Sequence, residues 1–312
     1  NPDILIADEP TTALDVTVQK TILELLRTLQ KKHNISLIFI SHNLDVIAEI
    51  ADNVLVMYKG QIVEKGIIKQ IFNHPQHPYT KGLLACRPPL GKRPHRLKVI
   101  ADFTEGSGNV DDSFITEDER SRFHAKLYSA DPILRTEGIN TVFTTKRTIT
   151  GKPVKQFKAV NNVSFEVYPG ETLGLVGESG CGKTTLGRTI LRLIEPSSGN
   201  TIYKNVQVND LKATDLLNLR KKLQIIFQDP YSSLNPRITI GESIIEPMRV
   251  HKLHGNENSR KVKVSELLQK VGLEASHYGR YPHEFSGGQR QRICIARALA
   301  VEPEFIICDE SV

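Results

Sequence analysis

The chain has 312 residues, of which 39% are hydrophobic and 24% charged, and it carries a net charge of +6. This length is enough for about two domains, and the composition is that of a globular protein rather than a disordered or fibrous one. No apolar run approaches the roughly 18–20 residues of a membrane helix, and no signal-peptide pattern opens the chain, so we expect any membrane role to act through partners. The charge is modest and spread along the chain, which argues against a nucleic-acid partner.

The four cysteines lie far apart in the sequence and form no C-x-x-C pair; they are Cys86, Cys181, Cys294 and Cys308. This spacing argues against a zinc site and against a disulfide framework. It indicates a protein of a reducing compartment.

The first predicted element is repeated at the end of the chain. "NPDILIADEP" opens the sequence and "EPEFIICDES" closes it, and each places Asp-Glu after an apolar run, at Asp8-Glu9 and Asp309-Glu310. Residues 1–8 are predicted to form a buried strand that ends in Asp8. An internal repeat of this kind must be explained by the architecture of the whole protein.

Strands and helices are predicted to alternate over the next 60 residues. "DVTVQKTILELLRTLQKKH" has apolar residues on one helical face, and the uninterrupted "ISLIFI" is typical of a parallel strand that is covered on both faces. "SHNLDVIAEIA" predicts a second helix, and "DNVLVMYKGQIVEKG" predicts a hairpin that turns at Lys59-Gly60. The alternation predicts an α/β fold with a parallel sheet.

The pattern changes at Cys86. Residues 86–131 are Pro-rich and basic at first and acidic later, without apolar periodicity, so we predict a linker there. A second β/α segment then begins. "NNVSFEVYPGETLGLVG" predicts a hairpin that turns at Pro169-Gly170 and continues as a strand into a Gly-rich loop, and "IIFQ" ends a further strand.

The Gly-rich stretch "GESGCGKTT" fits the P-loop pattern G-x-x-x-x-G-K-[ST] in full. Its glycines let backbone N–H groups converge on phosphate oxygens, at the N-terminus of a helix. We predict that Lys183 reaches the β- and γ-phosphates of a nucleotide and that the Thr184 hydroxyl binds Mg²⁺. The predicted nucleotide-binding residues are Gly177, Glu178, Ser179, Gly180, Cys181, Gly182, Lys183, Thr184 and Thr185.

Two further motifs complete the candidate site. Asp309 ends an apolar strand, where its carboxylate can face the Mg²⁺ shell, and Glu310 can orient or deprotonate the attacking water. An isolated Asp-Glu pair is more often a solvated loop, but the P-loop upstream favours the functional interpretation. "FSGGQRQR" places a serine and two glycines at a helix start, which is either a second anion site or only an N-cap; its residues are Ser286, Gly287, Gly288 and Gln289.

The order of these motifs resembles the ATP-binding cassette (ABC) ATPases: a P-loop, then Gln228 after a strand, then "SGGQ", then "FIICDE". The resemblance implies a P-loop α/β fold with a parallel sheet core, an antiparallel β subdomain and a helical subdomain that carries the signature. It implies ATP and Mg²⁺ as cofactors, bound between two cassettes, with Gln228 contacting Mg²⁺ and nucleotide. "FQDPYSSLNPRITI" and "HPQHPYTKGLLA" resemble the importers of dipeptides, oligopeptides and nickel, although the second stretch is also compatible with a simple capped helix.

The N-terminal part resembles the second half of the same cassette. Glu9 would be its catalytic glutamate, and Asp15 in "TALD" would lie in the loop that communicates across the cassette dimer. His42 would contact the γ-phosphate, although an isolated histidine after a strand is more often a capping or packed residue. The family also stacks the adenine on an aromatic near the start of the cassette, for which Phe143 and Phe157 are candidates and Phe143 is preferred.

The resemblance implies three parts: residues 1–85 are the C-terminal part of a first cassette, 86–131 a linker, and 132–312 the N-terminal part of a second cassette. A fragment of a tandem two-cassette protein explains the repeated ends better than a permuted single cassette does. Each part then lacks what the other half of its own cassette supplies. We therefore expect an ATPase whose isolated fragment has weak turnover or none.

The predicted function is that of the ATP-hydrolysing subunit of an ABC importer for peptides or similar solutes. The implied partners are a second cassette, membrane permease subunits and, indirectly, an extracytoplasmic solute-binding protein, with no nucleic acid. The implied location is peripheral, at the cytoplasmic face of the inner or plasma membrane. The alternative is a non-transport ABC ATPase that acts on DNA or ribosomes, for which steeply salt-dependent DNA binding would be diagnostic.

Overall fold

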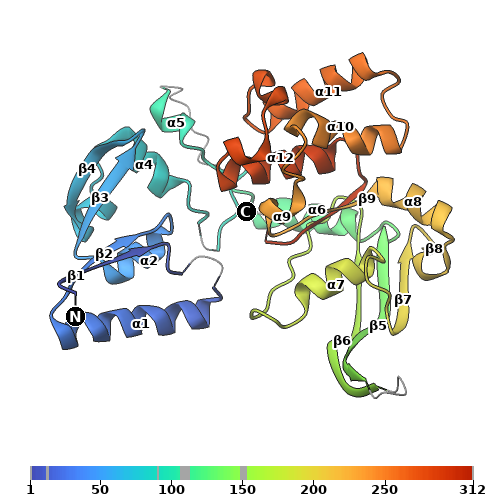
Figure 1. Cartoon of the computed structure of the whole chain (residues 1–312), viewed down its shortest axis with the longest axis horizontal. Helices are drawn as coiled ribbons and strands as arrows, with labels where there is room; N and C mark the ends of the chain where they lie inside the picture. The colour runs from blue at the N-terminus through green and yellow to red at the C-terminus, as the bar shows by residue number, and fades with distance from the viewer. Residues whose placement is uncertain (1, 12–13, 90, 106–112, 148–152, 311–312) are drawn as a thin grey trace. The chain divides into compact units, whose positions relative to one another are not determined.

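The structure is a computed structural model that describes residues 2–11, 14–89, 91–105, 113–147 and 153–310. The chain divides into two compact units, Asn1–Ser129 and Ala130–Val312. The first unit contains β1 (Ile4–Asp8), α1 (Val16–His33), β2 (Ser36–Ile40), α2 (Leu44–Ile50), β3 (Asn53–Tyr58), β4 (Gln61–Ile67), α3 (Ile68–Asn73), α4 (Pro78–Ala85), α5 (Ala101–Thr104) and α6 (Glu117–Leu127) (Figure 1).

Strand and helix alternate at the start of the first unit, as predicted. β1 and β2 pair in parallel, with Ile4 opposite Ser36 and Asp8 opposite Ile40. α1 connects them, capped by Asp15 at its start and ended by Asn34 in the left-handed conformation. Asn43 caps α2 in the same way as Asp15 caps α1. Because parallel strands share an edge at their carboxyl ends, the residues after β1 and after β2 meet there.

The predictions that β1 is a buried strand and that "ISLIFI", which forms β2, is covered on both faces are wrong for this structure. Alternate side chains along the pair are half-buried, but those on the other face are exposed: Ile4 58%, Ile6 63%, Ile38 50% and Ile40 46%. Burial of a sheet face requires a packed layer of side chains from another element. Within the described residues of this unit, only one face of the pair has such a layer.

The hairpin and the segment after it are joined by one carboxylate. β3 and β4 pair antiparallel and turn at Lys59-Gly60, as predicted. Glu64 of β4 accepts hydrogen bonds from the backbone N–H of Gln76, at 2.8 Å, and of His77, at 3.0 Å. His77 in turn caps α4. The "HPQHPYT" stretch is therefore fastened to the hairpin rather than loosely attached to it.

We expect Glu64→Gln to lower the free energy of unfolding of the first unit by about 1 kcal/mol, since charge-assisted hydrogen bonds weaken while the shape is kept. Burial raises the pKa of Glu64, but the hydrogen bonds that its carboxylate accepts outweigh burial and lower the pKa below its usual value. The stabilisation is therefore complete above the usual pKa and is lost as the pH falls through the lowered value. Urea unfolding at pH 7 and pH 3 measures both effects. The exposed Glu24→Gln is the matched control, and an equal loss there would contradict the prediction.

The segment 86–131, predicted as a linker, contains two helices, α5 and α6. α6 begins with a capping box between Thr116 and Glu119. An isolated antiparallel β-bridge joins Pro94 to Phe114, so the segments that contain these two residues lie next to each other. This local structure was not predicted, because none of these elements carries a long apolar period.

The second unit contains the P-loop and the signature motif. Its elements are β5 (Leu134–Arg147), β6 (Pro153–Val167), α7 (Lys183–Ile190), β7 (Ser198–Tyr203), β8 (Val206–Gln207), η1 (Val208–Asp210), α8 (Ala213–Lys222), β9 (Leu223–Ile226), α9 (Pro230–Ser233), α10 (Ile240–Val250), α11 (Glu257–Lys270), η2 (Ala275–Gly279), η3 (Pro282–Glu284), α12 (Gly287–Leu299) and β10 (Phe305–Cys308).

Two hydrophobic cores organise the second unit. One lies between α7, α8 and the antiparallel sheet, whose strand order is β6-β5-β7-β8; among its buried residues are Leu134, Ile139, Leu186 and Ile190. The other lies between α10, α11 and α12 and includes Ile240, Ile244, Leu268 and Ile293. β9 and β10 form a separate parallel pair, with Ile226 opposite Cys308. The antiparallel, helical and parallel parts predicted for the cassette are all present.

The strand predicted between Pro169-Gly170 and the P-loop is absent from the structure. Residues 172–178 are described without regular structure, and Leu173, Leu175 and Val176 are exposed. β6 pairs with β5 instead. A strand is held by hydrogen bonds to a neighbouring strand, and no described strand pairs with this stretch. The apolar pattern therefore predicted a strand that finds no neighbour here.

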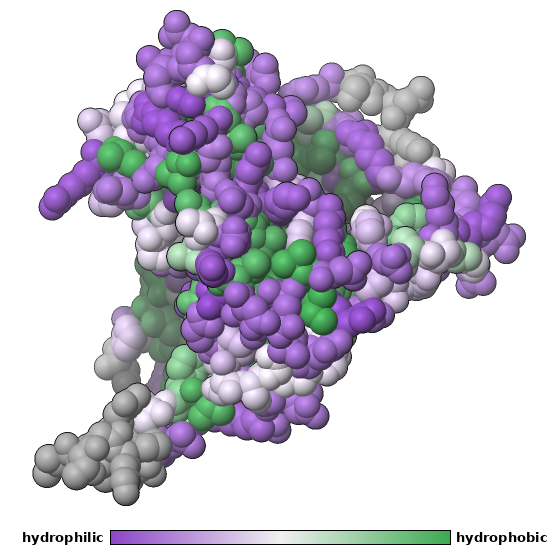
Figure 2. Space-filling view, turned by 90° about the vertical axis from the view of Figure 1, so that its right-hand side faces the viewer, coloured by the Kyte–Doolittle hydropathy of each residue, from purple (hydrophilic) through white to green (hydrophobic). Residues whose placement is uncertain are grey.

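The face of the molecule shown in Figure 2 is mostly hydrophilic, and its hydrophobic residues gather in separate patches. Among the described residues, no helix combines the length and the apolar character needed to cross a membrane.

Candidate nucleotide-binding site

The P-loop wraps around the start of α7, which begins at Lys183 with Gly182 as its N-cap. Gly182 has φ +102°, and a Cβ built on it would lie 2.2 Å from the backbone oxygen of Ala159 on β6. Gly180 also has a positive φ, of +77°. Only glycine fits the close approach at Gly182, so this residue lets the loop lie directly against the strand.

Lys183 folds back over the loop. Its Nζ donates to the backbone oxygens of Gly177, at 2.7 Å, and of Glu178, at 2.8 Å. The ammonium group therefore lies above the loop, near the first turn of α7. The first backbone N–H groups of a helix have no partner within the helix, so cation and amides together make this place favourable for anions.

The P-loop and the acidic strand are joined by a direct side-chain contact. Thr184 Oγ1 donates to Asp309 Oδ1 at 2.9 Å, and Asp309 is held in place because its N–H donates to the backbone oxygen of Ile226. Asp309 is 9% exposed, and its second oxygen, Oδ2, is buried without a hydrogen-bond partner among the described residues. A buried carboxylate oxygen without a partner is costly unless a cation or a donor meets it.

Gln228 and Glu310 also meet, although 82 positions separate them in the sequence. Gln228 Nε2 donates to Glu310 Oε2, which joins the ends of β9 and β10. Glu310 has φ +46°, a left-handed conformation that is uncommon for glutamate and that directs its side chain away from the strand path. Four predicted residues, Thr184, Gln228, Asp309 and Glu310, are thus collected at the carboxyl ends of two parallel strands.

Ser286 is the N-cap of α12. Its hydroxyl accepts from the N–H of Gln289 at 3.3 Å, and the side chain of Gln289 accepts from the N–H of Ser286 at 3.0 Å. Among the described residues, the hydrogen bonds of Ser286 remain within its own helix start. The residue is exposed, and its hydroxyl hydrogen can still be donated to an anion. Both interpretations made from the sequence, a cap and an anion site, are compatible with this geometry.

The acidic pair of the first unit repeats part of this arrangement. Glu9 has φ +46°, as Glu310 has, and its Oε1 lies 2.9 Å from His42 Nδ1. Glu9 follows β1 and His42 follows β2, so the parallel pairing brings them together. Asp15 accepts from the N–H of Val18 and acts as a helix cap. Two residues of the "TALD" stretch, Thr12 and Ala13, lie outside the described residues.

Family comparison assigns the motifs of the second unit. Residues 160–312 match the model of the ABC transporter family. This segment of the chain belongs to the ABC transporter family. Residues 63–108 match a second family, the oligopeptide/dipeptide transporter C-terminal region. The "HPQHPYT" stretch lies within these matched residues.

Curated relatives cover the entire chain. Glutathione import ATP-binding protein GsiA of Shigella flexneri is 49% identical over 311 residues, and GsiA of Salmonella paratyphi A is 48% identical over 316 residues. Both alignments include 100% of this chain but 49% of the relative, so the chain spans about half the length of the curated relatives it matches.

Solved structures show the same ABC cassette fold. The ATP-binding cassette MJ0796, in a dimeric post-hydrolysis state bound to ADP and Pi, is 28% identical with a TM-score of 0.52. That alignment covers 57% of this chain and 74% of the other. A second dimeric structure of MJ0796, described as a bacterial ABC transporter cassette, is 29% identical with a TM-score of 0.50, over 56% of this chain and 72% of the other.

Phe143 and Phe157, the two aromatic candidates in this ABC cassette, are direct partners across β5 and β6. Both rings are partly exposed, at 39% and 55%. Because paired residues point to the same face of a sheet, the two rings form one apolar platform rather than two alternatives. Phe157 lies two residues before Ala159, the residue that contacts the P-loop.

Sequence reasoning missed a set of contacts between α9, the short helix that follows Gln228, and the signature helix α12. The Arg290 guanidinium lies 3.9 Å from the ring centre of Tyr231, and Arg290 Nε donates to the backbone oxygen of Pro282. Arg297, seven positions further along α12, donates to the backbone oxygen of Ser233. One face of α12 therefore holds α9, which begins two residues after Gln228. The i, i+7 spacing of the two arginines is the signal that could have indicated this face.

Proposed function

We propose that this chain binds and hydrolyses ATP as part of the ATP-binding subunit of an ABC importer of peptides or similar solutes. The hydrogen bond between Thr184 and Asp309 supports this most directly, because it places the P-loop hydroxyl and the acidic strand at one point. The full-length GsiA matches and the oligopeptide/dipeptide region favour import over action on DNA or ribosomes. Glutathione, named for GsiA, is a tripeptide and therefore a solute of the proposed class.

Mg²⁺ fits this site, since Asp309 Oδ2 is buried and lacks a partner among the described residues. Thr184, Asp309 and Gln228 are the residues that would hold it. A bound Mg²⁺ neutralises charge on the nucleotide phosphates. Lys183 and the first amides of α7 bind the phosphates, and the Phe143 and Phe157 platform takes the adenine.

Glu310 is the proposed catalytic base, whose carboxylate would orient or deprotonate the attacking water. Gln228 holds the Glu310 carboxylate through the hydrogen bond described above. In the other cassette, Glu9 would have the role of Glu310, and His42 would contact the γ-phosphate. Ser286, with Gly287, Gly288 and Gln289, would complete an ATP site on a second cassette, and Asp15 would communicate across that dimer. Membrane permeases and, indirectly, a solute-binding protein are the proposed further partners, at the cytoplasmic face of the membrane.

The domain organisation is part of the proposal. Residues 1–85 would be the end of one cassette, 86–131 a connection and 132–312 the start of the next. Each part would then have only some of the catalytic residues of its cassette and would lack those from the other half of the same cassette. The ATP turnover of the chain by itself should therefore be weak.

Asp309→Asn should remove the Mg²⁺ dependence of ATP binding. We expect the wild-type chain to bind ATP at least about tenfold more tightly with Mg²⁺ than with EDTA, because one charge-assisted ligand is worth about this factor. Calorimetric titration with ATP in both conditions measures the ratio, which should approach one in the variant.

Asp215→Asn, on the exposed start of α8, removes the same charge and should keep the ratio of the wild type. A wild-type chain that does not bind MgATP would overturn the proposed function, and an unchanged ratio in Asp309→Asn would overturn the assigned Mg²⁺ ligand.

A further inference from the structure

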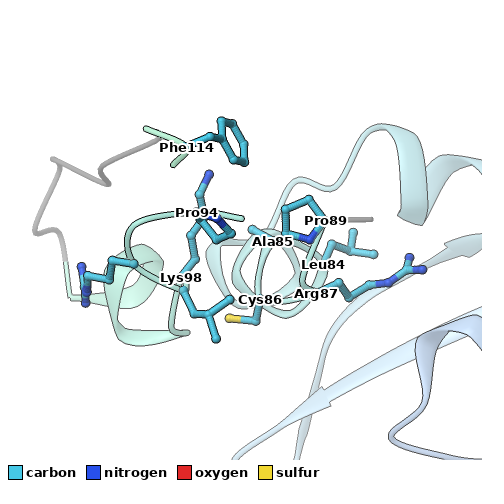
Figure 3. Close-up of a pocket in the computed structure, with 10 residues that line it drawn as sticks. Leu84, Ala85, Cys86, Arg87, Pro89, Pro94, Lys98 and Phe114 are labelled. Atoms are coloured by element: carbon cyan, nitrogen blue, oxygen red, sulfur yellow. The ribbon is translucent and has the colours of Figure 1, made fainter. Parts of the chain in front are cut away.

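A cavity of about 220 Å³ lies in the first unit, beyond the end of α4, with Leu84 and Phe114 on opposite sides (Figure 3). The two arginines that line it, Arg87 and Arg96, are already paired with carboxylates. The contacts that bear on the nucleotide site lie in the second unit, between α12 and the segment that carries Gln228.

Residues of α12 hold the chain on both sides of Gln228. Before it, Gln291 Nε2 donates to the backbone oxygen of Phe227, at 3.4 Å. After it, the Arg290 guanidinium lies 3.9 Å from the ring centre of Tyr231, on α9. The two contacts come from neighbouring residues of one helix, so the position of α12 fixes the path of the chain through Gln228.

The Arg290 side chain is itself firmly placed. It is 9% exposed, and its Nε donates to the backbone oxygen of Pro282 at 2.6 Å. A guanidinium that is hydrogen-bonded along one edge can still present its flat face to an aromatic ring. Tyr231 therefore rests on a fixed surface, although its own side chain is 63% exposed.

The Tyr231 ring also reaches the signature motif. A Cβ built on Gly287 would lie 4.0 Å from Tyr231 Cε2, so the ring lies beside the first residue of α12. Asp229 accepts from the N–H of Tyr231, at 2.8 Å, and caps α9. Because Asp229 follows Gln228 directly, any shift of the ring moves the backbone next to Gln228.

We propose that Tyr231 and Arg290 are positioning residues for Gln228. Gln228 holds the Glu310 carboxylate and is one of the proposed Mg²⁺ ligands. Without the contact between ring and guanidinium, the backbone at Gln228 has more than one orientation, and ordering it lowers the affinity for MgATP. The signature helix then acts on the site of its own cassette, in addition to the role of Ser286 at a second one. The inference rests on the proposed function and adds residues that this function does not name.

Tyr231→Leu should lower the ratio between the ATP affinity with Mg²⁺ and that with EDTA about two- to fivefold, the value of an exposed cation–π contact. The affinity in EDTA should stay that of the wild type, because Lys183 and the first amides of α7 bind the phosphates without Gln228. Calorimetric titration with ATP in both conditions measures the two affinities. A merely structural defect would instead weaken binding in both conditions, and this result would overturn the positioning role.

Three further variants separate the contact from other effects. Tyr231→Phe keeps the ring and should keep the wild-type ratio, since the contact needs no hydroxyl. Tyr128→Leu removes a tyrosine of similar exposure, 52%, from the first unit and should also keep the ratio. Arg290→Lys should lower the ratio, because an ammonium group lacks the flat face. Combining it with Tyr231→Leu should lower the ratio no further, since both changes remove one contact.

The positioning role would be overturned by a wild-type ratio in Tyr231→Leu, by an equal loss in Tyr231→Phe or Tyr128→Leu, or by additive losses in the double variant. A wild-type chain that does not bind MgATP would overturn the proposed function, and this inference with it. The two failures are therefore distinguished by the titration of the wild type alone.

Discussion

Lys183→Ala is expected to lower the affinity of the chain for MgATP by about 100-fold or more. The ammonium group donates to two carbonyl oxygens and to Cys181 Sγ, all within the loop itself, so its removal should affect binding rather than stability. Each charge-assisted hydrogen bond to a phosphate contributes on the order of 1.5–3 kcal/mol, and the lysine can form more than one. Calorimetric titration with MgATP measures the change.

Lys212→Ala is the control for this experiment, because Lys212 is an exposed cation of the same unit outside the P-loop. The melting temperatures of both variants should remain close to that of the wild type. ATP binding by Lys183→Ala at wild-type affinity would contradict the assignment of this loop as the phosphate site.

Gly182→Ala should disrupt both the loop and the stability of the second unit. An added Cβ would meet the Ala159 oxygen at 2.2 Å, and the residue would also have to keep a φ of +102°. Left-handed strain and steric overlap together should lower the free energy of unfolding by about 2–5 kcal/mol. Denaturant unfolding measures this loss, and the affinity for MgATP should fall because the loop can no longer lie against β6.

Gly170→Ala separates strain from overlap. Gly170 has a similar φ of +83°, but a Cβ there meets no atom within 4 Å. Gly170→Ala should therefore lower the free energy of unfolding only by the cost of the left-handed conformation, about 1–2 kcal/mol. If both variants lost the same free energy of unfolding, the contact between the P-loop and β6 would not be the cause.

The P-loop of the candidate nucleotide site could be recognised from the sequence because its pattern is local. The pattern of glycines with Lys183 and Thr184 requires a particular backbone over nine residues, and the helix start at Lys183 is where that pattern places it. The caps at Asp15 and Ser286 also follow from neighbouring residues alone. Such features can be predicted without knowing which residues distant in the sequence pack nearby.

The predictions that failed concern the pairing of strands with one another and the burial of strand faces under a second layer. The apolar run that includes Leu173 and Leu175 has the composition of a strand, yet it has no described neighbour with which to form hydrogen bonds. Ile6 and Ile38 have the composition of a core, yet no layer among the described residues of their own unit covers them. An apolar pattern shows that a segment can be buried, whereas burial itself depends on which other segment packs against it.

The sequence by itself determined the ABC family, the P-loop, the acidic residues and the alternation of helices and strands, because each depends on residue types at short spacing. Only the tertiary structure decided that Thr184 meets Asp309, that Phe143 and Phe157 form one platform, and that Arg290 holds Tyr231. These contacts join residues up to 125 positions apart, and sheet pairing and helix packing, rather than any local preference, bring such residues together.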